Sequence, residues 1–498
     1  MVRMGFDALL GRMHELKDLS GLVFLATWDQ QTYLPPKGED ARGHQLATLQ
    51  GILHERLVDP ALGELLERAR AGPLEDDERA MVRVLSRERD RAVRVPPSLV
   101  RALAQAQSRG LTAWRAARQA RSFAPFAPAL KTLLELRRQQ ADAIGHGGER
   151  YDALLDGYEP GMTVARLTPV LARLKERLVP IVRALASARQ PEDVLSGRRF
   201  EAETQRRFTL RLLEEMGFDF GAGRQDQSVH PFSGGTHARD VRLTTRIDEG
   251  QLSAVFASLH EGGHGLCEQG YSEAHHRTPL AAAPSTGLDE AQARLWENLV
   301  GRSRPFWRRF FPVLQQHFPQ SLSDVTADGF HGAINRVGPS LIRGHADEVT
   351  YNLHIVLRYE LELLLVHDEL PLEELPREWN RRMMELLGVT PPHDTAGVLQ
   401  DIHWSSGDLG YFPTYALGNL YGASLFAALR RDATDLDERL ERGELTVVTR
   451  WLREKIHSQG SRHDAEELVA RICGHGLRDD DLIEYLKAKY SQLCGVAL

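Results

Sequence analysis

Residues 259–266 contain a His-Glu-x-x-His pattern and read Leu259-His260-Glu261-Gly262-Gly263-His264-Gly265-Leu266. Side chains four residues apart share one face of an α-helix, so His260 and His264 would direct two imidazoles at one point. Two histidines at this spacing form half of a zinc site, and Glu261 points to the side where a water on the metal would lie. The alternative is a helix in which both histidines have purely structural partners.

Two adjacent glycines interrupt this pattern. Each glycine costs a helix about 1 kcal/mol relative to alanine. A close approach of backbone or substrate would explain Gly262 and Gly263, whereas a locally weak helix is the simpler alternative.

Overall composition is that of an ordinary globular protein. The chain has 498 residues, of which 42% are hydrophobic and 26% are charged, and both fractions are typical of soluble domains. A net charge of −7 argues against a nucleic-acid partner. The segment from Arg101 to Arg121 is basic around Trp114, and we interpret it as a solvated helix face.

Membrane and export signals are absent from the sequence pattern. The segment from Met1 to Trp28 lacks the apolar core of a signal peptide, and no run of eighteen apolar residues occurs, so we expect no membrane partner. The three cysteines, Cys267, Cys473 and Cys494, form no C-x-x-C pair. Their small number favours a reducing compartment and predicts a cytoplasmic protein.

Helical periodicity dominates the chain and predicts a mainly α fold. Apolar residues recur every three or four positions in the ranges 41–57, 129–144, 169–178, 204–216, 354–366 and 482–493. Thr168-Pro169 is a typical helix start, because a capping hydroxyl precedes a proline at the first helical position.

One strand and three loops complete this pattern. Asp240 to Arg246 alternates and contains β-branched residues, which predicts one strand of a small β-sheet just before the metal helix. The ranges 221–237, 272–287 and 389–397 are rich in glycine, proline or polar residues and are expected to be loops. No linker or repeat divides the chain, so the simplest prediction is a single large helical unit.

A third metal ligand is needed because catalytic zinc usually has three protein ligands and an open position. The segment after residue 287 has a helical stripe and offers two glutamates seven residues apart, Glu290 and Glu297, on one face. Asp289 is a third candidate, and spacing alone does not choose among them. With any of these, a zinc-activated water could attack a peptide bond while Glu261 acts as general base.

Six ordered segments give the chain a resemblance to the thermostable carboxypeptidase Taq family of His-Glu-x-x-His metallocarboxypeptidases. They are similar to the family patterns W-D-x-x-T-Y-x-P-P, H-P-F, D-x-R-x-T, the metal motif followed by E-Q-G, I-R-x-x-A-D, and G-Y-F-P-T preceded by His-Trp. In this sequence these segments are Trp28 to Pro36, His230 to Phe232, Asp240 to Thr244, His260 to Gly270, Ile342 to Asp347, and His403-Trp404 with Gly410 to Thr414.

The resemblance implies which carboxylate completes the metal site. The family's H-E-S/G-Q glutamate matches Glu290, so the implied ligands are His260, His264 and Glu290. Asp289 stands where the family has histidine, and Ala291 where it has serine or glycine. His345, where the family usually has glutamate, and Cys267, where an aromatic residue is common, are two further departures.

The resemblance also implies substrate-binding residues. Arg343 would bind the C-terminal carboxylate of a peptide, because a guanidinium can bind a carboxylate bidentately. Tyr411 and Tyr415 would lie nearby, and His403 with a tyrosine would donate to the oxyanion of the tetrahedral intermediate. His230 is a further substrate-binding candidate.

Each of these residues also has a structural alternative. Arg343 could pair with Asp347, four residues later. Tyr411 and Phe412 could be core aromatics, and His230 could cap a loop.

The function implied by the resemblance is that of a metal-dependent carboxypeptidase with broad specificity. We expect one catalytic domain over residues 1–498, with a deep active-site groove. Zn²⁺ is the expected metal, with Co²⁺ as the alternative. The expected substrates are peptides with a free C-terminus, and the family suggests a homodimer. Competing interpretations are an oligopeptidase or aminopeptidase on a related helical scaffold, and a catalytically weak peptide-binding homologue suggested by Asp289 and Ala291.

Overall fold

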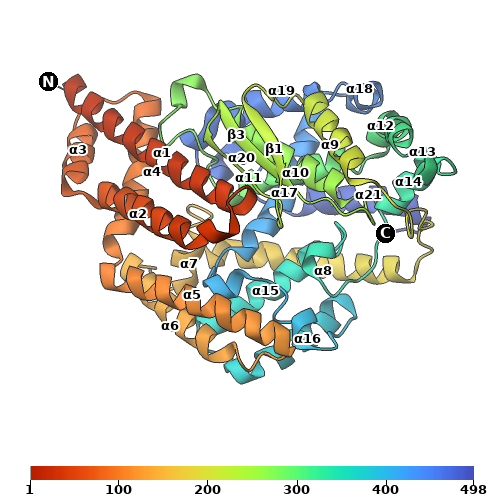
Figure 1. Cartoon of the computed structure of the whole chain (residues 1–498), viewed down its shortest axis with the longest axis horizontal. Helices are drawn as coiled ribbons and strands as arrows, with labels where there is room; N and C mark the ends of the chain where they lie inside the picture. The colour runs from red at the N-terminus through yellow and green to blue at the C-terminus, as the bar shows by residue number, and fades with distance from the viewer. Residues whose placement is uncertain (1) are drawn as a thin grey trace. The chain divides into compact units, whose positions relative to one another are not determined.

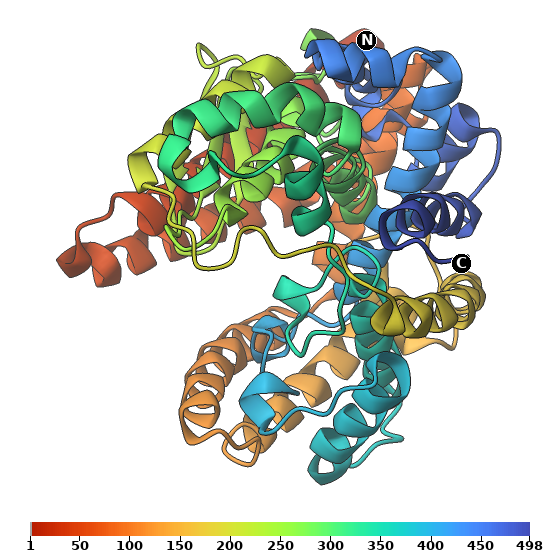
Figure 2. The ribbon, with the colours of Figure 1, turned by 90° about the vertical axis from the view of Figure 1, so that its right-hand side faces the viewer.

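A computed structural model describes residues 2–498 of the chain (Figures 1 and 2). It confirms the mainly α class with a small sheet: the described residues form helices α1 to α21 and three strands. The chain divides into two compact units, each assembled from three segments. Unit 1 contains the residues up to Val93, Asp193–Ile334 and Leu425–His475, and unit 2 contains Arg94–Glu192, Asn335–Ser424 and Gly476–Leu498.

Unit 1 contains the sheet and most of the helices. Its elements are α1 (Val2–Thr32), α2 (Glu39–Val58), α3 (Pro60–Arg70), α4 (Asp76–Arg94), α9 (Ala202–Met216), β1 (Gly223–Gln227), β2 (Ser233–His237), β3 (Asp240–Thr245), α10 (Ser253–Glu268), α11 (Thr286–Arg294), a π-helical segment (Leu295–Val300), α12 (Arg304–His317), α13 (Pro319–Leu322), α14 (Ala327–Ile334), α18 (Leu436–Arg442), α19 (Thr446–Lys455) and α20 (Ala465–Cys473). In Figure 2 the green helices of residues 304–334 lie side by side in this unit.

The sheet has β3 in its centre, parallel to β1 and antiparallel to β2. Val241 and Leu243 of β3 are completely buried, which is the period-2 pattern of a strand with one apolar face. Helix α10 packs against β3 and β2 and against α9 (Figure 1). The sheet and α9 therefore hold the His-Glu-x-x-His helix between them.

Unit 2 is helical throughout its described residues. Its elements are α5 (Pro97–Ala120), α6 (Ala127–Ile144), α7 (Arg150–Leu155), α8 (Val164–Ser187), α15 (Tyr351–Val366), α16 (Leu375–Leu387), α21 (Asp480–Cys494) and the first part of α17 (Phe412–Asp432), whose last residues belong to unit 1. Helix α15 is central, with thirteen buried residues, and it packs against α8 and α16.

Short 3₁₀ turns occur in both units. They cover Pro36–Gly38, Glu273–His275, Arg343–His345, Leu372–Glu374, Asp394–Ala396, His403–Ser406 and His457–Arg462.

Most predicted elements agree with the structure, but two predictions are wrong. The range 221–237 contains β1 and β2 rather than a continuous loop; these polar, glycine-containing strands are stabilised by pairing with β3, not by an apolar pattern of their own. Helix α8 starts at Val164, not at Pro169. An Asp152 carboxylate oxygen accepts from the Val164 N–H, while the Thr168 hydroxyl lies 2.6 Å from the hydroxyl of Tyr359 instead of capping the helix.

None of the helices found in residues 2–498 combines the length and apolar character needed to cross a bilayer. The prediction that the whole chain acts as one catalytic domain with a deep groove stays a prediction.

Candidate functional site

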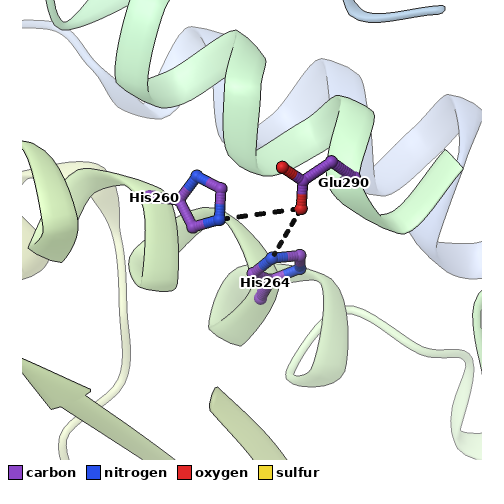
Figure 3. A group of neighbouring side chains, drawn as sticks. All are labelled: His260, His264 and Glu290. Carbon is purple, nitrogen blue, oxygen red and sulfur yellow. Dashed lines mark ion pairs between the residues drawn. The ribbon is translucent and has the colours of Figure 1, made fainter. Parts of the chain in front are cut away.

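The two histidines of α10 lie one turn apart on the same face, as predicted (Figure 3). Their ring centroids are 5.0 Å apart, and the side chains of His260 and His264 are 16% and 15% exposed. Such limited exposure favours metal binding, because few waters compete for the ring nitrogens.

Glu290 extends from α11 toward both rings (Figure 3). Its Oε2 lies 3.7 Å from Nε2 of His260 and 3.8 Å from Nε2 of His264. The three ligand atoms all lie within 4.8 Å of one another. Ligands about 2.1 Å from a tetrahedral zinc are roughly 3.4 Å apart, so these three residues fit a small divalent metal.

A carboxylate holds the other nitrogen of each ring. Nδ1 of His260 lies 3.0 Å from Oε2 of Glu297, and Nδ1 of His264 lies 3.1 Å from Oδ2 of Asp289. Metal-binding histidines usually donate their second N–H to such a partner, which fixes the tautomer and the ring orientation. The contact of His260 with Glu297 is a hydrogen bond, whereas that of His264 with Asp289 is an ion pair without hydrogen-bond geometry. Both rings present Nε2 to Glu290.

Arg294 donates to two of these carboxylates. Its Nε donates to Oε1 of Glu290 at 2.7 Å, and its Nη1 donates to Oε2 of Glu297 at 3.1 Å. One oxygen of Glu290 is therefore held by arginine, and the other faces the two imidazoles.

The electrostatics of this group favour positive charge at its centre. Burial raises the pKa of Glu290, but Arg294 and the two histidines outweigh burial and bring the pKa below its usual value. The pKa of Glu297 falls to about 2, since Arg294 and His260 outweigh burial there too. Burial opposes the charged form of His264, yet Asp289 and two glutamates raise its pKa to about 10.

Glu261 is buried in α10, with 6% of its surface exposed. Its negative charge is one of those that raise the pKa of His264. The role of Glu261 as general base stays a prediction.

The glycines of α10 permit close helix packing. A Cβ on Gly263 would lie 2.8 Å from Cα of Ala293 in α11, and one on Gly262 would lie 2.5 Å from Cδ2 of Leu213 in α9. The predicted close backbone approach is confirmed for Gly263, and it brings the Glu290 helix next to the histidine helix.

Arg343 belongs to a separate buried charge cluster in unit 2. Its Nε and Nη2 donate to Oδ1 of Asp401 at 3.0 and 2.9 Å, and its Nη1 donates to the Tyr351 hydroxyl at 2.8 Å. Arg358, which is completely buried, donates to Oδ2 of the same aspartate at 2.7 Å. The pairing of Arg343 with Asp347 is wrong: the Asp347 carboxylate accepts from backbone N–H groups, including those at 349 and 350.

The predicted aromatic residues lie together in unit 2. The His403 ring is 5.4 Å from Tyr411 and 4.5 Å from Phe412, between centroids, and its Nε2 is 3.3 Å from the Tyr415 hydroxyl. The Arg343 guanidinium lies 4.8 Å from the centroid of the Tyr415 ring. Burial lowers the pKa of His403 to about 4, so this imidazole is neutral at pH 7.

Buried Glu362 of α15 organises the segment that carries these residues. Its carboxylate accepts from the hydroxyl of Tyr151, the indole N–H of Trp404 and the backbone N–H of Gly410, at 2.7, 2.8 and 3.0 Å. The two ends of the segment between His403 and Tyr411 are thus attached to one side chain.

His230 is exposed in the connection between β1 and β2. The neighbouring Phe232 is fixed by Thr244 of β3, whose hydroxyl accepts from the Phe232 N–H at 2.8 Å. The H-P-F and D-x-R-x-T segments are therefore in contact, and this contact holds the connection between β1 and β2 against β3.

Sequence reasoning missed three residues of these clusters. Arg294 follows Glu290 by four residues, a helical spacing that could have suggested the ion pair. Asp401 and Glu362 come from segments distant from their partners, and nothing in the sequence pattern links them.

Comparison with known proteins gives a match over nearly the whole chain. The model of a family described as carboxypeptidase Taq (M32) metallopeptidase matches residues 8–490. The chain belongs to this family. It is therefore a metallocarboxypeptidase, a peptide hydrolase of the carboxypeptidase Taq type, and the predicted resemblance is confirmed.

Relatives match over nearly their full lengths. Thermostable carboxypeptidase 1 of Thermus thermophilus is 43% identical over 505 residues, covering 98% of this chain and 99% of the relative. Carboxypeptidase 1 of Bacillus subtilis is 36% identical over 485 residues, covering 97% of each. The solved M32 carboxypeptidase of Deinococcus radiodurans R1 has a TM-score of 0.97 at 37% identity and covers 99% of this chain and 100% of that one.

Proposed function

We propose that this carboxypeptidase Taq protein releases single residues from peptide C-termini with broad specificity, using Zn²⁺ held by His260, His264 and Glu290. The observation that carries the proposal is the convergence of three ligand atoms within 4.8 Å, beside buried Glu261. Co²⁺ is the alternative metal, because imidazole and carboxylate ligands suit both ions.

The residues around the metal position have different roles in the proposed hydrolysis. A divalent metal in this site supplies a Lewis acid that polarises the scissile carbonyl and lowers the pKa of water. Glu261 accepts the proton of the attacking water and delivers it to the leaving amine. Glu297, Asp289 and Arg294 keep the ligand side chains oriented through the contacts described above.

Recognition of a free C-terminus is assigned to Arg343. A guanidinium binds a carboxylate through two parallel N–H donors. The ion pair of Arg343 with Asp401 supports a fixed orientation for this guanidinium, since its Nε and Nη2 both reach one carboxylate oxygen.

His403 and the tyrosines near it are the remaining residues proposed to contact the substrate. A neutral His403 has one ring N–H to donate to a developing oxyanion, and Tyr411 is the tyrosine assigned to act with it. Tyr415 and His230 are assigned to peptide binding by the family resemblance. The homodimer and the cytoplasmic location also stay predictions.

Replacing Glu261 by glutamine tests the mechanism. Glutamine keeps the size of the side chain but cannot accept the proton, so kcat should fall at least about 100-fold. Metal content, measured by elemental analysis, should stay equal to that of the wild type.

The control is Glu273→Gln, which changes an exposed glutamate of the same unit that pairs with Arg239. Its activity should equal that of the wild type. Unchanged turnover in Glu261→Gln would end the proposed role of this carboxylate.

A further inference from the structure

The two metal-site histidines are held by carboxylates of different origin. Glu297, in the π-helical segment, contacts Nδ1 of His260, whereas Asp289, the residue before the ligand Glu290, contacts Nδ1 of His264. One helix therefore supplies both a ligand and an orienting group.

The local structure of α11 sets the position of Asp289. The Ser285 hydroxyl accepts from the Leu288 N–H at 3.0 Å and caps the helix, so Asp289 lies in its first turn. A carboxylate in a first turn is stabilised by the positive end of the helix dipole. Successive helical residues point about 100° apart, which allows Asp289 and Glu290 to reach different atoms of the same histidine.

The contact places a negative charge next to the ring nitrogen of His264 that faces away from Glu290. The Asp289 carboxylate lies 3.1 Å from Nδ1 of His264 as an ion pair, without the geometry of a hydrogen bond. A negative charge at this distance favours a proton on Nδ1 and leaves Nε2 as the ring nitrogen that binds a metal.

We infer that Asp289 is a positioning residue of the metal centre: its carboxylate orients His264 so that Nε2 faces the metal position, and it raises the affinity of this chain for a divalent metal. The inference rests on the proposed metal site and adds to it a determinant of affinity.

Two variants, Asp289→Asn and Asp289→Ala, test the inference through metal binding rather than activity. The dissociation constant for Zn²⁺ is measured by competition with a chelator, and the visible spectrum of the Co²⁺-loaded protein reports the ligand geometry. Loss of an orienting partner typically weakens metal binding 10- to 100-fold. We expect both variants to show this loss, together with a changed Co²⁺ spectrum and an unchanged far-ultraviolet circular dichroism spectrum.

The matched control is Asp328→Asn. Asp328 also lies in the first turn of a short helix and makes an ion pair, with Arg304 at 2.8 Å, but it has no contact with a ligand histidine. Its metal affinity should equal that of the wild type. The inference is overturned if both Asp289 variants bind Zn²⁺ within threefold of the wild type, whereas wild-type protein that binds no stoichiometric metal would refute the proposed metal site instead.

Discussion

The role proposed for Arg343 depends on the contacts that its guanidinium already makes. Its Nε and Nη2 contact Asp401, and its Nη1 contacts Tyr351. Each terminal guanidinium nitrogen carries two hydrogens, so Nη1 and Nη2 each have a second N–H beyond these contacts. We propose that a peptide carboxylate binds to the N–H groups of Nη1 and Nη2 that these contacts leave over.

Replacing Arg343 by methionine should raise KM for peptides with a free C-terminus by about 10- to 100-fold, the effect of losing one or two charged hydrogen bonds. Peptides with an amidated C-terminus should show little change. Arg382→Met is the control, because Arg382 has the same 14% side-chain exposure and also makes ion pairs in unit 2. Equal losses on both classes of peptide would contradict the assigned role.

Contacts between residues were predictable where they follow from short spacing in the sequence. The spacing of His260 and His264 predicted their shared face, and the structure brings Glu290 to them. The partner of Arg343 was not predictable, because Asp401 is 58 residues away in the chain. Only the folded backbone brings such charges together.

At the scale of elements, the contact between α10 and α11 decides the geometry of the metal site. A Cβ on Gly263 would lie 2.8 Å from Cα of Ala293 and 3.1 Å from its backbone N. Backbone atoms cannot move aside as a flexible side chain can, so a larger residue must separate the two helices.

Gly263→Ala should therefore destabilise the protein by about 1–3 kcal/mol through overpacking and weaken metal binding, because Glu290 moves with α11. Thermal melting and chelator competition measure the two effects. Gly51→Ala in exposed α2, where no heavy atom lies within 4 Å, should instead gain about 0.5–1 kcal/mol. A Gly263 variant as stable and as metal-binding as the wild type would refute the packing argument.

The long helices were predictable because their apolar periodicity is strong, as in α9 and α15. Strands β1 and β2 were not predictable, because their polar and glycine residues form strands only through hydrogen bonds to β3. The start of α8 was misplaced because a side chain from another segment caps it.

At the scale of the whole molecule, buried histidines make stability depend on pH. His457 in unit 1 is 1% exposed, and neither of its ring nitrogens has a hydrogen-bond partner among the described residues. Burial, followed by the charge of Arg453, lowers the pKa of His457 from 6.5 to about 3. Between these two pKa values the unfolded chain binds a proton at His457 that the folded chain excludes. The contribution of neutral His457 to the free energy of unfolding is therefore complete above about pH 6.5 and is lost as the pH falls toward 3.

Replacing His457 by leucine should remove this contribution to acid sensitivity. Near pH 5 one excluded proton changes the free energy of unfolding by about 1.4 kcal/mol per pH unit. The decrease in melting temperature between pH 7 and pH 5 should thus be smaller in His457→Leu than in the wild type. Identical pH profiles would show that His457 takes up its proton in the folded protein.

The central claim, a metal-dependent carboxypeptidase centred on His260, His264 and Glu290, is tested most directly by mass spectrometry of peptides digested with metal-loaded protein. We predict a ladder of products shortened one residue at a time from the C-terminus, no ladder for the amidated peptide, and loss of cleavage after chelation that added Zn²⁺ or Co²⁺ restores. Internal fragments, residues lost from the N-terminus, or full activity in the chelated protein would contradict it.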